Sequence, residues 1–390
     1  MPNPPVRVRM APSPTGFVHL GSARTMLFNL LFARSQGGVM VLRVDDTDTD
    51  RNRPEYEQTI YDGFHWLGLD WDEGPDKGGP YGPYRQSERI DRYRELAARL
   101  LGEGSAYRCY CTKEELDAER EAARKAGVPY KYSRRCLTDP PRDRTEFAVR
   151  LRVPEGETRF LDLIRGELAF QNELIGDPVI VRTSGMPLYN FTSTVDDTDM
   201  EITHVIRGEE HLSNTPVQLM LFDALHHPRP QAFAHVPVIV GADHKKLSKR
   251  RHPELRLFLY REQGYLPQAL VNYLVLLGWN PGTEQEIWSF EELVRAFTLE
   301  RVQSSPAMFD WKRLDWLNAH YIRQLSDREL AERLEAFLPH LSPSTLLAAA
   351  PALKERLPRL DAAVALLSYL EEPPETPELT QPQQELLREA

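Results

Sequence analysis

The fold is decided by the stretch from Val6 to Ser22, which has the sequence VRVRMAPSPTGFVHLGS. Val6, Val8 and Met10 alternate with arginines, a pattern that is typical of a strand with one buried face. The prolines and glycines that follow predict a turn, and the apolar residues beyond the turn recur at helical spacing. A strand, a turn and a helix in this order begin a parallel α/β unit.

The stretch up to Asp48 completes that unit. Ser22 is the expected N-cap of the helix, and the pair Gly37-Gly38 predicts its end. The apolar run from Val39 to Val44 predicts a second strand, which closes on Asp45-Asp46-Thr47-Asp48. Strand, helix and strand at this spacing imply a right-handed parallel crossover, the first half of a doubly wound α/β fold. The apolar face of the helix consists of Ala23, Met26, Leu27, Leu30 and Leu31.

Composition narrows the class of protein. The 390 residues are 41% hydrophobic and 27% charged, which is ordinary for a soluble globular protein. No run approaches the roughly 18 apolar residues of a membrane span, and no secretory signal is evident, so we expect no membrane association. A net charge of -10 argues against indiscriminate polyanion binding but leaves room for local basic patches. Three cysteines make no disulfide framework and indicate a reducing compartment, the cytoplasm.

Further elements follow along the chain. Residues 84–185 combine a charged helical pattern, the cysteines and short strand-like runs, which indicates an inserted subdomain. From residue 322 the pattern is helical and rich in Leu and Ala. Strands are predicted over Phe147 to Val153, Val179 to Val181, Glu201 to Ile206 and Val236 to Val240, with the second and third returning to the main sheet, and helices over Ser87 to Leu101, Thr215 to Leu225 and Leu266 to Leu277.

Two short motifs carry the candidate chemistry. His19-Leu20-Gly21-Ser22 lies where a helix N-terminus would offer free N–H groups and a positive dipole end to phosphate. Gly21 permits close approach of a ligand, and His19 can donate a hydrogen bond to a phosphate oxygen. Lys246-Leu247-Ser248-Lys249-Arg250 is a cationic loop after an apolar strand. Alone, each motif has a plainer interpretation, namely a structural turn histidine and a solvated run of charges.

As a pair, far apart in the sequence, these motifs resemble the HIGH and KMSKS signatures of class I aminoacyl-tRNA synthetases. Five further segments resemble the glutamyl-tRNA synthetases in particular, and the resemblance extends from about Val6 to about Arg323. Those segments are Ala11 to Gly16, Asp45-Asp46-Thr47-Asp48, Tyr189-Asn190-Phe191, Val195-Asp196-Asp197 and Val205 to Leu212.

The resemblance implies a Rossmann-like doubly wound catalytic core with an inserted acceptor-binding subdomain, followed by an all-helical C-terminal region. In this family the helical anticodon-binding part has two halves, and the second half is expected to be lacking here. The expected divisions are 1–84 and 186–240 for the two halves of the core, 85–185 for the insertion, 241–320 for the KMSKS-type loop and stem-contact region, and 321–390 for a partial anticodon-binding domain.

The resemblance also implies a reaction. ATP activates L-glutamate to glutamyl-adenylate, and the glutamyl group passes to the 3′ end of tRNA(Glu), with activation waiting for bound tRNA. Charge builds on the phosphates, so positioning and positive charge do most of the catalysis. His19, Lys246 and Lys249 are the expected catalytic residues, and with Gly21 and Ser248 they are expected to bind ATP. Mg²⁺ is expected to be held mostly by phosphates and water.

Glutamate recognition requires cations for two carboxylates and an acceptor for an ammonium group. An arginine offers a two-pronged donor to carboxylate, which makes Arg9 and Arg207 the candidates. For Arg207 the alternative is a surface ion pair with Glu209 or Glu210. The family has Glu at the position of Asp45, whose shorter side chain is expected to reach the ammonium or ribose only after a shift or through water. The expected site is Arg9, Ala11, Ser13, Asp45, Tyr189 and Arg207.

The cysteines suggest a zinc site. Cys109, Cys111 and Cys136 supply three ligands, whereas a closed zinc site needs four. Similar bacterial glutamyl-tRNA synthetases and glutamyl-queuosine tRNA synthetases complete the set with a His after the last Cys or a Tyr before it. Thr138 stands at the histidine position, so Tyr132 is the expected fourth ligand. The alternative is a site without metal that holds reduced, buried cysteines.

Several alternatives remain at this stage. The chain continues well beyond the point where glutamyl-queuosine tRNA synthetases end, and the helical C-terminal pattern differs from the β-barrels of glutaminyl-tRNA synthetase. A catalytically impaired tRNA-binding paralogue is the alternative from another class, and intact His19, Lys246 and Lys249 argue against it. The sequence does not decide whether tRNA(Gln) is charged along with tRNA(Glu), and a monomer is expected.

Overall fold

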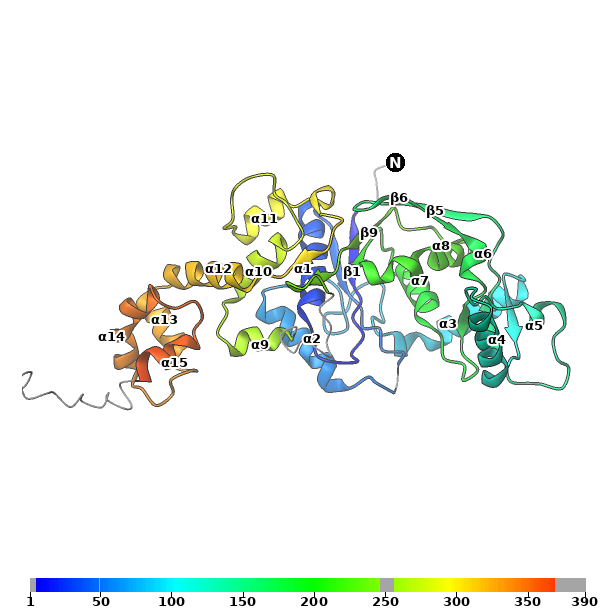
Figure 1. Ribbon diagram of the computed structural model, residues 1–390, viewed down its shortest axis with the longest axis horizontal. Coiled ribbons are helices and arrows are strands. Elements are labelled where there is room, and N and C mark those ends of the chain that lie inside the picture. The colour runs from blue at the N-terminus through cyan, green and yellow to red at the C-terminus, as the bar shows by residue number, and fades with distance from the viewer. Residues whose placement is uncertain (1–4, 49, 246–255, 369–390) are drawn as a thin grey trace, which may run out of the picture. The chain divides into compact units, whose positions relative to one another are not determined.

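Figure 1 shows the computed structural model, which describes residues 5–48, 50–245 and 256–368. The chain divides into two compact units. The first comprises Met1–Leu259 and Leu270–Asp310, and the second comprises Tyr260–Ala269 and Trp311–Ala390. A search of the described helices finds none with the length and apolar character that crossing a bilayer requires.

Strands occur only in the first unit among the described residues, whereas helices occur in both. The strands are β1 (Arg7–Met10), β2 (Val39–Leu42), β3 (Ala106–Cys109), β4 (Ala148–Leu151), β5 (Glu157–Asp162), β6 (Gly166–Gln171), β7 (Val179–Val181), β8 (His204–Gly208), β9 (Ala232–Val236), β10 (Ile239–Val240) and β11 (Ala307–Met308). The helices are α1 (Leu20–Ser35), α2 (Pro54–Trp66), α3 (Ile90–Gly102), α4 (Lys113–Lys125), α5 (Arg135–Thr138), α6 (Asn172–Ile175), α7 (Tyr189–Asp199), α8 (Thr215–Ala224), α9 (Leu257–Glu262), α10 (Pro267–Leu276), α11 (Phe290–Ala296), α12 (Trp311–Gln324), α13 (Asp327–Leu334), α14 (Pro343–Lys354) and α15 (Ala362–Leu367).

The predicted N-terminal unit is confirmed. Strands β1 and β2 pair in parallel, from Arg7 opposite Val39 to Met10 opposite Leu42, and α1 connects them. The predicted cap is wrong, because α1 begins at Leu20 and its N-cap is His19. His19 has an extended backbone, and its ring nitrogen accepts from the backbone N–H of Ser22. Ser22, the residue expected to cap the helix, therefore donates its backbone N–H to the residue that does cap it, His19.

The main sheet continues through strands from much later in the sequence. β8 and β9 pair in parallel, and β5 joins β9 in the order β6-β5-β9-β8. β1 lies beside this sheet, since the backbone N–H of Thr203, just before β8, donates to the Arg7 carbonyl, and the Arg7 backbone N–H donates to Thr203 Oγ1. The strand predicted over Val236 to Val240 is divided at Pro237, which has no N–H for the ladder, into the end of β9 and the short β10. The Rossmann-like α/β core is thereby confirmed.

One strand differs from the prediction. Val179–Val181, expected in the main sheet, forms β7 in a separate sheet with the order β3-β4-β7. Gly176, whose φ of 68° favours glycine, stands between α6 and β7, and β7 runs antiparallel to its neighbour β4. The hairpin of β5 and β6 lies within the predicted insertion, yet it shares a sheet with β8 and β9; β5, β6 and β9 are labelled in Figure 1. The division at residues 85 and 185 stays a prediction.

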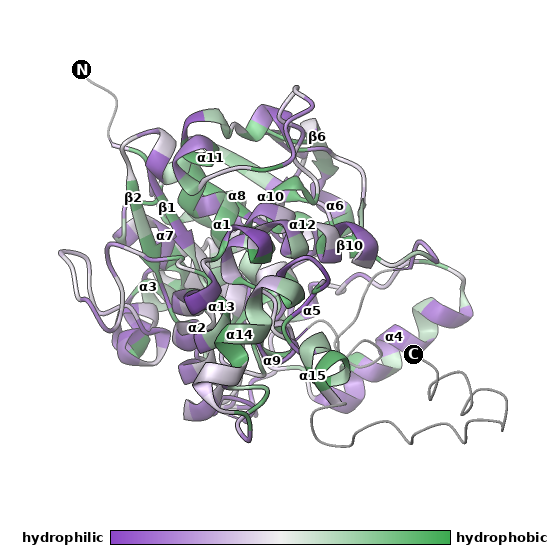
Figure 2. Ribbon diagram, turned by 90° about the vertical axis from the view of Figure 1, so that its left-hand side faces the viewer, coloured by the Kyte–Doolittle hydropathy of each residue, from purple (hydrophilic) through white to green (hydrophobic). Residues whose placement is uncertain are grey.

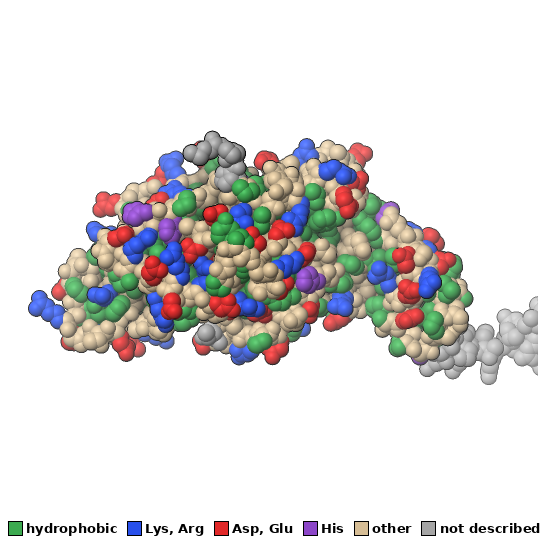
Figure 3. Space-filling view, turned by 180° about the vertical axis from the view of Figure 1, so that it is seen from behind, with side chains coloured by type: hydrophobic (Ala, Val, Ile, Leu, Met, Phe, Trp, Pro, Cys, Tyr) green, Lys and Arg blue, Asp and Glu red, His purple; other side chains and the backbone are tan. Residues whose placement is uncertain are grey.

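The described part of the second unit is helical, as the C-terminal pattern predicts. Ser326 and Ser342 cap α13 and α14 by accepting from backbone N–H groups three residues on. Apolar side chains, most of them leucines, from several helices form one core, which includes Ile322, Leu330 and Leu346. On the face of the molecule drawn in Figure 3, Lys and Arg side chains are interspersed with Asp and Glu.

Candidate active site

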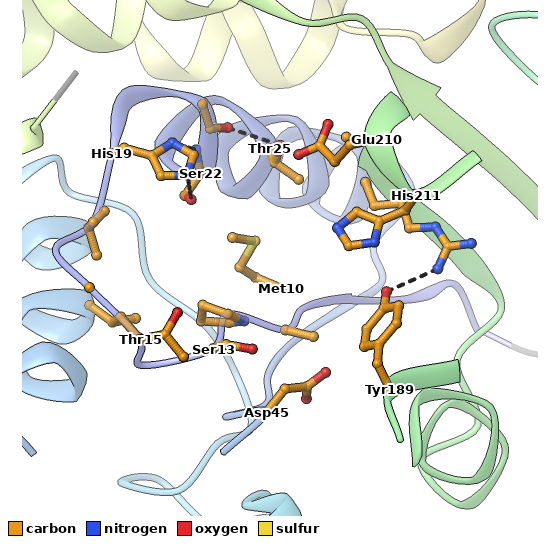
Figure 4. Close-up of a pocket in the computed structure, with 18 of the residues that line it drawn as sticks. Met10, Ser13, Thr15, His19, Ser22, Thr25, Asp45, Tyr189, Glu210 and His211 are labelled. Carbon is orange, nitrogen blue, oxygen red and sulfur yellow. Dashed lines mark hydrogen bonds between the residues drawn. The ribbon is translucent and has the colours of Figure 1, made fainter. Parts of the chain in front are cut away.

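A cavity of about 740 Å³ opens at the carboxyl ends of β1, β2 and β8. Ligands of open α/β sheets bind at this edge, because the strand ends leave a crevice there. His19 and Ser22 line one end of the cavity, and Tyr189 and His211 line the opposite end (Figure 4). All the predicted site residues that the structure describes outside the cysteine region line it, namely Arg9, Ala11, Ser13, His19, Gly21, Asp45, Tyr189 and Arg207.

The first end of the cavity is shaped by the start of α1. Nδ1 of His19 lies 3.2 Å from the backbone nitrogen of Ser22, and Nε2 lies 3.2 Å from its Oγ. A Cβ on Gly21 would lie 3.2 Å from the His19 ring, so the glycine makes room for that ring. His19 therefore caps the helix and also lines the cavity. Lys246, Ser248 and Lys249 lie outside the described residues.

Arg207 dominates the second end. It is 4% exposed, and its guanidinium donates to Tyr189 Oη at 3.2 Å, to Thr215 Oγ1 at 2.8 Å and to His235 Nε2 at 3.1 Å. The described residues provide no carboxylate partner for it, and burial lowers the pKa of Arg207. A buried cation without a counter-ion is costly, which makes this end of the cavity favourable for an anion.

The alternative of a surface ion pair between Arg207 and its acidic neighbours is wrong. Glu209 instead pairs with Arg165 and accepts from the backbone N–H of Val238. Glu210 lines the cavity, and no ion pair between it and Arg207 is present among the described contacts. Arg207 thus remains available to a ligand.

Arg9 differs from Arg207 because its charge is already compensated. Its Nε and Nη2 lie 3.1 and 3.3 Å from the two carboxylate oxygens of Asp197. This pairing lowers the pKa of Asp197 against the opposite effect of burial. Arg9 can still present donors to the cavity that it lines, but an incoming carboxylate would share it with Asp197.

Asp45 belongs to a buried charge network beneath the cavity. Its Oδ1 accepts from Arg43 Nε at 2.8 Å, and Arg43 Nη1 donates to Asp197 at 2.7 Å. The Arg43 side chain is 0% exposed, and Asp196 lies 3.6 Å from its Nε. Burial raises the pKa of Asp45 to about 6, although the Arg43 charge opposes that rise. Asp45 is therefore fixed by Arg43 at the cavity wall.

Sequence reasoning missed several polar residues of this site. Arg43 did carry a signal, because a single arginine inside the apolar run Val39 to Val44 must find a partner when the strand is buried. His211 lines the cavity, and burial together with the Arg207 charge lowers its pKa to about 4, so it is neutral near pH 7. Asp162 and His235 lie on strands far apart in the sequence and carry no local signal.

The cysteine cluster lies elsewhere in the first unit. The sulfur atoms of Cys109, Cys111 and Cys136 all lie within 4.8 Å of one another, the one such group among the described residues that could hold a metal. Tyr132 Oη lies 3.4 Å from Cys109 Sγ and 3.1 Å from Cys111 Sγ. Four donors around one point, three of them sulfur, suit a tetrahedral zinc ion. The residues present therefore fit the expected metal.

Two arginines accompany the four donors. Arg135 Nε donates to Cys111 Sγ at 3.1 Å, and the Arg150 guanidinium lies 3.9 Å from the centre of the Tyr132 ring. The backbone N–H of Tyr110 donates to Cys136 Sγ. Positive charges and N–H donors of this kind stabilise thiolates around a metal.

Comparison with known proteins defines the class. The catalytic domain family of class I tRNA synthetases (E and Q) matches residues 5–316, so the chain belongs to that family. It is similar to the glutamate–tRNA ligase of Symbiobacterium thermophilum, with 52% identity over 338 residues, 84% of this chain and 70% of that protein. The glutamate–tRNA ligase of Moorella thermoacetica is 53% identical over 327 residues, 82% of this chain and 66% of that protein.

Solved structures give the same class. The glutamate–tRNA synthetase of Elizabethkingia anophelis superimposes with a TM-score of 0.89 at 32% identity, covering 99% of this chain and 86% of that one. The glutamate–tRNA ligase of Elizabethkingia meningosepticum, solved in complex with its amino acid, matches equally well, with 85% of its chain covered.

Proposed function

We propose that this chain is a glutamate–tRNA ligase, which uses ATP to convert L-glutamate to glutamyl-adenylate and transfers the glutamyl group to the 3′ end of tRNA(Glu), releasing AMP and diphosphate. One observation carries the proposal beyond the family. Arg207 is a buried cation at the wall of the cavity, and the described residues supply it with no carboxylate. A carboxylate of the substrate would serve as the counter-ion of Arg207.

In this proposal the amino acid binds between Arg207 and Asp45. Arg207 and the Tyr189 hydroxyl hold a carboxylate, while Asp45 supplies negative charge for the ammonium group. His19 and the N-terminus of α1 then contact the α-phosphate region, since they line the other end of the same cavity. The reaction needs the other carboxylate of glutamate, which Arg207 does not hold, to meet the α-phosphate in line, and the placement of the two binding ends in one cavity favours this.

Lys246, Ser248 and Lys249 are proposed to hold the ATP phosphates, and Lys249 to stabilise the departing diphosphate. Mg²⁺ supplies further positive charge to those phosphates when it is bound. A zinc ion held by Cys109, Cys111, Cys136 and Tyr132 is proposed as structural, because four protein donors leave no position open for a substrate. A cytoplasmic location and a monomeric state are part of the proposal.

The decisive experiment is aminoacylation of purified tRNA(Glu), tRNA(Gln) and tRNA(Asp) with labelled glutamate, aspartate or glutamine, in the presence of ATP and Mg²⁺. We expect labelled glutamate on tRNA(Glu), and the tRNA(Gln) arm decides whether that tRNA is charged as well. Charging of tRNA(Asp) alone would favour a glutamyl-queuosine tRNA synthetase. Tight tRNA binding without any charging would favour the impaired paralogue.

A further inference from the structure

A line of three buried polar groups runs from the cavity wall into the sheet. Arg207 Nε donates to His235 Nε2 at 3.1 Å, and His235 Nδ1 lies 2.6 Å from Asp162 Oδ2. The side chains of His235 and Asp162 are both 0% exposed. Only Arg207 of the three lines the cavity, so the other two act on a ligand through it.

The hydrogen bonds determine which nitrogen of His235 carries the proton. A guanidinium N–H can only donate, so Nε2 accepts from Arg207, and the hydroxyl of Thr215, whose Oγ1 lies 3.1 Å from the same nitrogen, can donate to it as well. Nδ1 then carries the hydrogen and donates it to the Asp162 carboxylate. Burial and the Arg207 charge lower the pKa of His235, which agrees with a neutral ring. A proton on Nε2 would point at the guanidinium and repel it.

Asp162 is itself fixed by the backbone around it. Its Oδ1 accepts from the N–H groups of Ile164 and Arg165 in the turn after β5, and its Oδ2 accepts from the N–H of His235. Asp162 also stands opposite Phe233 where β5 meets β9. The carboxylate therefore has one orientation, and this orientation sets that of the imidazole.

The arrangement leaves Arg207 with a defined set of free donors. A guanidinium carries five N–H groups. His235, Thr215 and Tyr189 each take one, from Nε, Nη2 and Nη1 respectively. Two N–H groups remain, one on each Nη, and a carboxylate has two oxygens to receive them.

We propose that Asp162 and His235 are positioning residues that hold the Arg207 guanidinium in the orientation that binds a carboxylate of the amino-acid substrate. This inference rests on the proposed function, because it assigns the carboxylate to glutamate. It predicts that a substitution at His235 changes glutamate affinity without touching the groups that contact ATP.

Two substitutions at one position separate the contacts. In His235→Asn the amide lies near the place of Nδ1, so it keeps the Asp162 contact and loses Arg207. In His235→Gln the amide reaches the place of Nε2 and can accept from Arg207 again. We expect the glutamate KM of H235N to rise about tenfold, the loss of roughly one hydrogen bond to a charged group, with kcat and the ATP KM within about twofold. H235Q should recover most of that loss.

His204→Asn is the matched control. His204 lies on the same strand as Arg207, contacts Thr203 and Phe32, and is not among the described residues that line the cavity. Its glutamate KM should stay unchanged, and thermal unfolding should show all three variants folded. An unchanged KM in H235N, a loss confined to kcat, or an H235Q as impaired as H235N would each overturn the proposal.

A second readout separates this inference from the proposed function. ¹⁵N-histidine spectra of the wild-type protein, assigned by the signal that H235Q lacks, report the tautomer of His235. We expect protonation at Nδ1, and protonation at Nε2 would overturn the inference even if glutamate is charged. Conversely, a wild-type protein that charges no tRNA with glutamate refutes the proposed function. The tautomer then still shows whether His235 accepts the hydrogen bond from Arg207. The same spectra decide the matter if H235N does not fold.

Discussion

The cavity and the cysteine cluster are built in opposite ways. The cavity joins residues from distant parts of the sequence, such as Arg9 and Arg207, through the parallel core sheet. The cluster draws its four donors from the single short segment between Cys109 and Cys136. Beneath the cavity every buried carboxylate of the network has an arginine, whereas the donors of the cluster mainly face one another.

This difference concerns what keeps each region ordered. The network around Arg43 is compensated by the protein's own charges, so the cavity is formed before any ligand arrives. Helix α4, which lies in the cysteine segment, has no buried residue, and hydrophilic residues run along it in Figure 2. Little apolar area is available there to offset the entropy of ordering. We infer that the order of the segment would depend on a metal held by the cluster, whereas the order of the cavity does not depend on its substrate.

The largest expected effect tests the charge network. Arg43→Gln leaves Asp45 and Asp197 buried without their shared cation, so the free energy of unfolding should fall by about 3–5 kcal/mol. Arg34→Gln is the matched control, because Arg34 pairs with Asp72 at a partly exposed site, where a pair contributes about 0–1 kcal/mol. Chemical denaturation measures both. Equal losses in the two variants would show that the network is not what orders the cavity.

The next effect tests whether the residues of the cavity bind glutamate whereas Lys249 accelerates the chemical step. Lys249→Ala should lower kcat by about 10²–10³-fold and leave the glutamate KM within about twofold, because this charge acts on the developing diphosphate. Steady-state aminoacylation measures both constants. Lys245→Ala, an exposed lysine near Asp243, is the control and should change neither. A raised glutamate KM with unchanged kcat would refute the role of Lys249.

A third effect concerns the metal. The isolated protein should contain about one zinc per chain by elemental analysis, and Cys136→Ser should lose it. Amide hydrogen exchange in β3 should then accelerate by roughly thirtyfold or more, while β1 stays protected. Ser133→Ala, near the same cluster, should keep both zinc and protection. Absence of zinc, with three freely titrating thiols, would favour the alternative of reduced, buried cysteines.

The smallest effect is a pH dependence confined to the cavity. The pKa of Asp45 is raised to about 6, so its carboxylate is charged above that pH and neutral below it. If it holds the glutamate ammonium, the glutamate KM should rise by up to about tenfold between pH 7 and pH 5. His211, with a pKa near 4, does not titrate in this range. Asp45→Asn should abolish the rise, and an identical pH profile in that variant would exclude Asp45 from ammonium binding.

The sequence predicts the parts of this site that lie at the ends of strands or at the starts of helices. Gly21, Asp45 and Tyr189 fall within short motifs next to recognisable elements, and the structure brings them to one cavity. The partners that a residue finds in distant parts of the chain are not predicted in this way. Asp197 lies on helix α7, so its pairing with Arg9 of β1 depends on where that helix packs, and local periodicity carries no information about that.

Two predictions of local structure are wrong, and each is overturned by a single residue. Ser22 looks like a better helix cap than His19 by residue type, but the extended backbone at His19 places the helix start earlier. The strand over Val236 to Val240 looks continuous by hydropathy, but Pro237 cannot donate to a ladder. In the cysteine cluster, by contrast, the prediction of Tyr132 depends on resemblance alone, and its hydroxyl lies beside the sulfur atoms.

The imidazole between Asp162 and Arg207 also restricts how this enzyme can evolve. The residue there must donate on one side and accept on the opposite side, and a neutral histidine does this across the width of its ring. A single substitution at His235 keeps one neighbour and abandons the other, so the effects of substitutions at His235 and Asp162 should depend on each other. A library that randomises both positions together should therefore recover pairs with a lower glutamate KM than the same His235 substitution has alone.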